Sequence, residues 1–163
     1  MKATGVVRVR MHGRTLLPLL LAVCAMSLPA MAGLGGDLNS VQGDAAHMKA
    51  AVKIEQREAY AVHTIATKNN TTVVREYVSP DGHVFGVAWG GPFMPNLSKV
   101  LGTYLQQFTT AMQEDHAKHP GRHPVSISQP GLVVQSMGKV RGYYGRAYVP
   151  EMLPQGVQPE EVR

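Results

Sequence analysis

Three segments in the middle of the chain alternate apolar and polar residues as β-strands do. They are residues 57–67, 71–78 and 83–89, which are rich in β-branched, small and aromatic side chains. Two turn signals separate them: the Asn residues at 68–70 tolerate a left-handed conformation, and "SPDG" at 79–82 combines Pro, Asp and Gly. The pattern predicts a three-stranded antiparallel meander.

The third of these strands has a period of two. This period places four larger side chains on one face, namely His83, Phe85, Val87 and Trp89. Gly86 is expected on the opposite face, where it leaves room for close backbone approach or a bend.

Two stretches repeat apolar residues at the spacing of an amphipathic helix. The stronger one follows Asn96, a suitable N-cap, with apolar residues at Leu97, Val100, Leu101, Tyr104, Phe108, Ala111 and Met112. The weaker one follows Asp37, with Leu38, Val41, Ala45, Met48 and Val52, and Gly43 weakens it by about 1 kcal/mol relative to Ala. We expect both apolar stripes to pack on the core.

Further strands are expected after the second helix. Residues 124–128 are a short candidate, and residues 131–136 and 139–149 are stronger ones, with Met137–Gly138 between them. The proline-rich segment 150–163 is expected on the surface, with at most one turn of helix. A parallel sheet would need more crossover helices than the chain has. The order therefore predicts an α+β fold, an antiparallel β-sheet (a meander plus a C-terminal hairpin) packed with one or two helices.

The first 32 residues have the features of a secretory signal peptide. A basic start precedes an apolar run that is shorter than the roughly 20 residues of a membrane-spanning helix, and small residues at Ala30 and Ala32 form a cleavage site. We expect cleavage between Ala32 and Gly33, and a product that is periplasmic or secreted and no longer spans a membrane. Met11 could equally be the start. The mature chain, residues 33–163, would form a single domain with a flexible lead-in at 33–37.

Removal of the signal changes the charge. It takes away four of the 16 basic residues (Lys2, Arg8, Arg10 and Arg14), which leaves 12 against 11 acidic ones, a net charge of about +1. The mature chain has no basic block with interleaved aromatics, so a nucleic-acid partner is not expected. The single cysteine, Cys24, lies within the signal, which excludes thiol catalysis and cysteine-based zinc sites in the mature protein.

Three histidines gather in "HAKHPGRHP", residues 116–124. His116, His119 and His123 could supply imidazole ligands to zinc, copper or nickel, with Glu114 or Asp115 nearby. Pro120 and Gly121 interrupt the cluster, and its basic neighbours repel a cation, so a solvated basic loop is the favoured interpretation.

Other catalytic patterns are weak. Ser136 follows an apolar strand and precedes Gly138, but Val134 replaces the first glycine of a nucleophile elbow. The carboxylate pairs Glu114–Asp115 and Glu160–Glu161 occur in exposed-looking segments, where a raised pKa is not expected. Phosphate-loop, dinucleotide-binding and HExxH motifs are absent. The sequence therefore predicts no cofactor and no enzyme activity.

Aromatic and basic side chains share one face of the strand at 139–149. A period of two places Tyr144, Arg146 and Tyr148 together, and Gly142 and Gly145 open space beside the rings. Such residues are enriched in binding hot spots, although they also form ordinary cross-strand pairs. With Trp89 on the neighbouring strand, they are the candidate binding surface.

Three blocks resemble a known family. They are "GLGGDLNSVQGDAAHM", "REYVSPDGHVFGVAWGGP" and "LVVQSMGKVRGYYGRAYVP". Together they are similar to bacterial exported proteins classified as domain of unknown function 2844, and the resemblance runs over essentially the whole mature chain. It implies a small secreted protein of a Gram-negative bacterium, without assigned activity or catalytic residues.

The first hypothesis is therefore a non-enzymatic binding or accessory module of the periplasm, with an unknown protein or glycan partner. The second is a metal-binding exported protein that uses His116, His119 and His123. The third is a hydrolase with Ser136 as its nucleophile.

Overall fold

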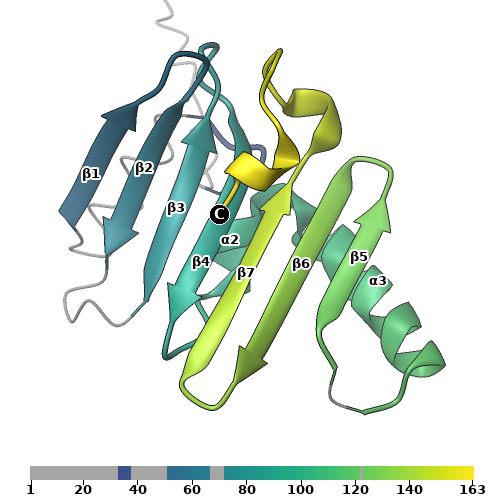
Figure 1. Ribbon diagram of the computed structural model, residues 1–163. Helices are drawn as coiled ribbons and strands as arrows, with labels where there is room; N and C mark the ends of the chain where they lie inside the picture. The colour runs from purple at the N-terminus through teal and green to yellow at the C-terminus, as the bar shows by residue number, and fades with distance from the viewer. Residues whose placement is uncertain (1–32, 38–50, 67–71, 122) are drawn as a thin grey trace, which may run out of the picture.

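Seven antiparallel strands form one sheet in the computed structural model, which describes residues 33–37, 51–66, 72–121 and 123–163. The strands are β1 (Ala51–Gln56), β2 (Ala61–Ala66), β3 (Val73–Val78), β4 (Val84–Gly91), β5 (Val125–Gln129), β6 (Leu132–Lys139) and β7 (Gly142–Tyr148). Their order across the sheet is β1-β2-β3-β4-β7-β6-β5 (Figure 1). The predicted α+β fold, a meander followed by a C-terminal hairpin, is confirmed.

The meander has four strands rather than the three predicted. Strand β1 pairs with β2 and includes Val52, which the prediction placed at the end of the first helix. From Val52 to Glu55 apolar and charged residues alternate, and Lys53 forms a 2.7 Å ion pair with Glu55 on the same face. The rest of that predicted helix, the turn at 68–70 and the signal peptide lie outside the described residues.

Helical segments connect β4 to the far edge of the sheet. They are α2 (Leu97–Leu101), the 3₁₀ turn η1 (Gly102–Tyr104) and α3 (Leu105–Lys118). The helix predicted after Asn96 is confirmed over Leu97–Lys118, with one irregularity at Gly102, whose φ of 51° and ψ of −126° depart from helical values. A Cβ on Gly102 would lie 3.0 Å from the carbonyl oxygen of Leu34, so the irregularity accommodates the N-terminal segment.

Residues 33–37 are part of the core. The Leu34 side chain has 0% exposure, its N–H donates to Val100 O at 3.0 Å, and the Gly35 N–H donates to Val84 O at 2.9 Å. The expectation of a flexible lead-in is therefore wrong. A single apolar residue among glycines gives no periodic signal, although it binds two elements together.

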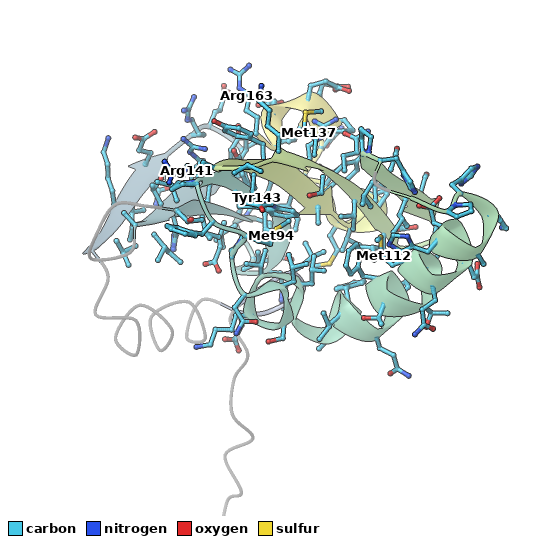
Figure 2. The ribbon with its side chains drawn as sticks, turned by 90° about the horizontal axis from the view of Figure 1, so that it is seen from below. Met94, Met112, Met137, Arg141, Tyr143 and Arg163 are labelled. Atoms are coloured by element: carbon cyan, nitrogen blue, oxygen red, sulfur yellow. The ribbon has the colours of Figure 1, made fainter. Side chains whose placement is uncertain are left out.

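The two faces of the sheet are covered by different parts of the chain. Helices α2 and α3 and residues 33–37 cover one face, which we call the helix face; its core includes Val87, Trp89 and Leu101. Residues 150–163 cross the other, the tail face, with short 3₁₀ turns at η2 (Pro150–Met152) and η3 (Pro159–Glu161). Figure 2 shows this arrangement, with Arg163 and Met137 on the tail face and Met112 on the helix face.

The C-terminal segment is more buried than its sequence suggests. Val162 has 0% exposure and Val157 is also buried, so the expectation that residues 150–163 lie on the surface is wrong for these two. Full burial of a valine side chain contributes about 1.5–3 kcal/mol. The segment has few apolar residues at irregular spacing, so no periodicity announces their burial.

A β-bulge in β4 changes which side chains share a face. Tyr77 pairs with Gly86 and Val78 pairs with Val84, so Phe85 is the extra residue. Phe85 joins the core of the tail face, whereas Val87 and Trp89 lie in the core of the helix face. The predicted common face of Phe85, Val87 and Trp89 is therefore wrong for Phe85.

The C-terminal hairpin turns later than predicted. Strand β6 continues through Gly138 to Lys139, and the turn is Val140–Arg141, with Arg141 at a φ of 64°. Gly138 lies opposite Tyr143, and a Cβ there would lie 2.6 Å from the Tyr143 ring. The glycine thus leaves space for the Tyr143 ring within a strand and does not form a turn.

No helix among the described residues is long and apolar enough to cross a membrane.

Candidate binding groove

An open groove of about 810 Å³ crosses the tail face beside the C-terminal segment. It is formed by β3, β4, β7, β6 and the start of β5, in that order across the sheet. Adjacent strands lie about 4.8 Å apart, so four spacings give the groove a length of roughly 19 Å. It runs across the strands rather than along one of them.

The strand register places polar side chains in one row across this groove. Arg75 lies opposite Ala88, Ala88 opposite Arg146, Arg146 opposite Gln135, and Gln135 opposite Ser126. We call Arg75, Arg146, Gln135 and Ser126 the polar row. Arg146 in this row donates a hydrogen bond to Pro159 O in the C-terminal segment. The polar row therefore lies on the side of the groove next to that segment.

A second row, two residues further along each strand, is apolar. Val73 lies opposite Gly90, Gly90 opposite Tyr144, and Tyr144 opposite Met137. We call Val73, Tyr144 and Met137 the apolar row. Tyr144 is 59% exposed and Met137 63% exposed, which is unusual for large apolar side chains in the middle of a sheet.

Glycine residues of β4, Gly90 and Gly91, line the floor of the groove. A Cβ on Gly90 would lie 3.2 Å from Cδ1 of Tyr144, so the Tyr144 ring lies over the glycine. Further along the strand, a Cβ on Gly86 would lie 2.9 Å from a methyl group of Val162. The C-terminal segment thus covers Gly86, whereas Gly90 is covered by the exposed ring of Tyr144 alone.

The groove carries positive charge. Arg75, Arg146 and Arg163 line it, and none of its described lining residues is Asp or Glu. Arg146 is engaged: its Nε donates to Gln135 Oε1 and its Nη1 to Pro159 O, both at 2.8 Å. Arg75 is half-buried and forms no hydrogen bond or ion pair within the described part of the chain. The two arginines therefore differ: Arg146 holds the C-terminal segment, whereas Arg75 has no partner among the described residues.

Two tyrosines hold the C-terminal segment at the edge of the groove. Tyr77 Oη donates to Arg163 O at 2.5 Å and accepts from the Arg163 N–H at 2.9 Å. Tyr60 Oη donates to Glu161 Oε2 at 2.9 Å. The Gln158 N–H and this hydroxyl lower the pKa of Glu161, and burial, followed by the Glu161 carboxylate, raises the pKa of Tyr60. The backbone of Arg163 is therefore fixed to β3 at Tyr77, and both Arg163 and Arg75 line the groove.

The side chains of two of the four predicted binding residues, Tyr144 and Arg146, line the open groove. Tyr144 and Arg146 share the tail face, as period two predicts. Tyr148 is on the same face but packs in the core under the C-terminal segment, 5.9 Å from the Arg146 guanidinium carbon. Trp89 borders the groove, yet its ring is only 3% exposed and lies in the helix-face core.

Sequence reasoning missed Arg75, Met137 and Arg163. The alternation in residues 71–78 would have placed Val73 and Arg75 on one face, had their neighbours across the sheet been known. Met137 was assigned to a turn. Arg163 has no local signal, because only the path of the C-terminal segment brings it here.

The histidine segment adjoins the end of the groove nearest β5. His119 Nδ1 lies 3.0 Å from Asp115 Oδ1, and the ring centroid of His123 lies 5.9 Å from those of both His116 and His119. The three rings therefore do converge. In the described residues, however, no group of three His, Cys, Asp or Glu side chains is placed to hold a metal ion.

Both ring nitrogens of His123 face oxygen atoms. Its Nδ1 lies 3.0 Å from Pro124 O, and its Nε2 lies 3.0 Å from His119 O and 3.4 Å from Asp115 Oδ2. The Pro124 carbonyl, together with Asp115, raises the pKa of His123 and favours the imidazolium form. A metal needs a free ring lone pair. The metal site stays a prediction, which a zinc titration of the native chain and of a His123→Ala variant would test.

The candidates for catalysis remain separate from one another. Ser136 lies inside β6, not at a turn between a strand and a helix, and its hydroxyl donates to Tyr144 O at 3.4 Å. Glu114 and Asp115 are on α3 on the other side of the sheet, and Glu161 holds the C-terminal segment. The described contacts place no histidine or carboxylate within hydrogen-bonding distance of Ser136.

Fold and groove together define a small α+β protein whose antiparallel sheet presents an arginine-lined groove on one face. The chain belongs to the family described as "Protein of unknown function (DUF2844)", whose match covers residues 30–162. This confirms the resemblance seen in the three sequence blocks. Comparison with curated proteins and with solved structures found no match.

Proposed function

We propose that this protein is an exported, non-enzymatic binding module of the periplasm or the extracellular medium, and that the groove across β3 to β5 is its binding site. The proposal of export comes from the basic, apolar and small-residue pattern of residues 1–32. The proposal of binding comes from the groove.

One observation carries the binding function: an exposed aromatic ring and an arginine without a partner among the described residues face the same groove. Tyr144 is seated over Gly90 on a central strand, so binding would immobilise little that is not already fixed. Arg75 is half-buried without a counter-charge among the described residues, and an incoming acceptor would satisfy it. Aromatic and arginine anchors of this kind dominate binding energies.

The composition of the groove supports binding rather than catalysis. Its described lining contains no Asp, Glu, His, Lys or Cys. General acid–base catalysis usually relies on these side chains, with a pKa tuned close to the working pH. Arginine, glutamine and serine can orient a ligand by hydrogen bonds, as the polar row does, without exchanging protons with it.

The test compares two adjacent tyrosines that point to opposite faces. The isotope-labelled mature chain would be titrated with a panel of fatty acids, oligosaccharides, peptidoglycan fragments and peptides, followed by NMR. We expect a ligand that shifts the amide resonances around Tyr144 and Arg75 and that binds at least about tenfold more weakly to Tyr144→Ala.

Tyr143→Ala is the matched control, since Tyr143 packs over Gly138 on the helix face and should leave the affinity unchanged. Binding that shifts other resonances, or that Tyr144→Ala retains, would exclude the groove as the site.

A further inference from the structure

Polar and apolar residues occupy different rows of the groove, and the arginines beside the C-terminal segment lie at a different end from the exposed apolar side chains. Arg75 and Arg163 stand at the β3 end beside the C-terminal segment, whereas Tyr144 and Met137 stand towards β6. On the assumption that the groove is a binding site, we propose that its ligand is an anionic amphiphile. Its carboxylate or phosphate head pairs with Arg75 and Arg163, and its apolar body crosses Gly90 to lie on Tyr144 and Met137.

The head position follows from the two arginines beside the C-terminal segment, of which Arg75 forms no hydrogen bond or ion pair with another described residue. Arg75 and Arg163 both border this groove and also the neighbouring hollow beside β1–β3. Arg146 is already engaged with Gln135 and Pro159, so it holds the C-terminal segment in place instead of the ligand. Guanidinium groups bind carboxylate and phosphate through charge-assisted hydrogen bonds, so these two arginines favour an anionic head at this end of the groove.

The body position follows from exposed apolar surface. From Arg75 to Met137 the groove crosses three strand spacings, roughly 14 Å, and passes Gly90, which has no side chain to obstruct it. Beyond Tyr144 and Met137 a further hollow of about 490 Å³ continues along Pro124, Gly138 and Gly142. A flexible chain can follow this path and remove both exposed side chains from water.

Two other ligand classes fit less well. A peptide strand binds through unpaired backbone groups at a sheet edge, but β4 and β7 each pair with neighbours on both sides. A polyanion would need available cationic side chains along the whole groove, whereas Arg146 in the middle is engaged with Gln135 and Pro159 and the β6 and β5 lining contains no Lys or Arg. A single anionic head on an apolar body matches both the charge and the shape.

Calorimetry on the mature chain tests the proposal with dodecanoate, dodecyl phosphate and dodecanol, and with acetate and inorganic phosphate as heads without bodies. We expect one-to-one binding of the two anionic amphiphiles, at least about tenfold weaker binding of dodecanol, and no binding of acetate or phosphate. The ratio between dodecanoate and dodecyl phosphate distinguishes a fatty acid from a phosphate-headed lipid as the natural source.

Variants locate the two ends. Arg75→Gln should weaken the anionic amphiphiles about tenfold and leave dodecanol unchanged, because it removes one charge-assisted contact. Met137→Ser should weaken all three amphiphiles. Lys118→Gln, which removes one exposed charge on α3 away from the groove, is the control and should change nothing.

Equal binding of dodecanol and dodecanoate, or equal effects of Lys118→Gln and Arg75→Gln, would overturn the assignment of the head. If no amphiphile binds while another compound binds in a Tyr144-dependent manner, the ligand class is wrong and the binding function stands. If no compound of the wider panel depends on Tyr144, both are wrong.

Discussion

The tail face has two halves that are built alike and filled differently. In one half, the buried side chain of Val162 covers Gly86. In the other half, the exposed ring of Tyr144 lies over Gly90, and no part of the C-terminal segment covers it. Both glycines belong to β4, and both are flanked by large side chains of β3 and β7. The strands therefore supply a continuous trough, and the C-terminal segment decides which part becomes core and which part becomes surface.

The largest loss in the free energy of unfolding is expected from a change at Val162, the side chain that covers Gly86 on the tail face. Val162→Asp places a charge at a site with 0% exposure, so the C-terminal segment must either bury the carboxylate or detach. We expect the free energy of unfolding to fall by about 3 kcal/mol. Denaturant unfolding would measure it, with Val140→Asp as the control, because Val140 is 79% exposed and should change stability by less than about 0.5 kcal/mol. Similar losses in the two variants would contradict the burial of Val162.

The two glycines provide a matched comparison. Gly86→Ala puts a methyl group 2.9 Å from Val162, in a region without space, and should lower the free energy of unfolding by about 1–3 kcal/mol. Gly90→Ala puts its methyl group 3.2 Å from an exposed ring that can move away. It should be neutral or stabilise by about 0.5 kcal/mol, because alanine restricts the unfolded chain. Thermal unfolding of both variants measures this difference, and equal melting temperatures would mean that both halves are equally filled.

The arginines of the polar row should also differ. Arg146→Gln removes the donors to Pro159 O and Val162 O and should cost about 1–2 kcal/mol in the free energy of unfolding. Arg75→Gln removes no described hydrogen bond and should leave stability within about 0.5 kcal/mol. Denaturant midpoints of the two variants distinguish a supporting arginine from one available to a ligand. A larger loss from Arg75→Gln would reverse these roles.

Local patterns predicted those parts of the site that depend on one strand at a time. Tyr144 and Arg146 share a face because β7 is regular, and period two predicts this correctly. Phe85 was assigned to the wrong face because a bulge adds one residue to β4, and the sequence "VFG" does not reveal which residue is the extra one.

The remaining parts arise from contacts between distant segments. Leu34 meets Val100, Val162 meets Gly86, and Arg163 meets Tyr77, and none of these pairs lies within a common local element. A glycine-rich stretch and a proline-rich stretch look like linkers because single apolar residues show no period. Their burial is decided by the shape of the sheet that they cover, and the groove is the part of that sheet that they leave open.

The smallest expected effect concerns His123, which links the end of α3 to the start of β5. Carbonyl oxygens of Pro124 and His119 face its two ring nitrogens, and its pKa is raised above the ordinary value of about 6.5. The protonated form is favoured in the folded state. The stabilisation that it gives is therefore fully present below the unfolded-state pKa and is lost as the pH rises through the higher folded-state pKa.

NMR titration of the histidine ring protons measures this directly. We expect His123 to titrate above the ordinary histidine pKa of about 6.5, and Asp115→Asn to lower the His123 pKa by removing a nearby negative charge. If His123 titrates below that ordinary value, the ring does not donate from both nitrogens. One of them would then have a free lone pair, and the obstacle to a metal ion at this cluster would disappear.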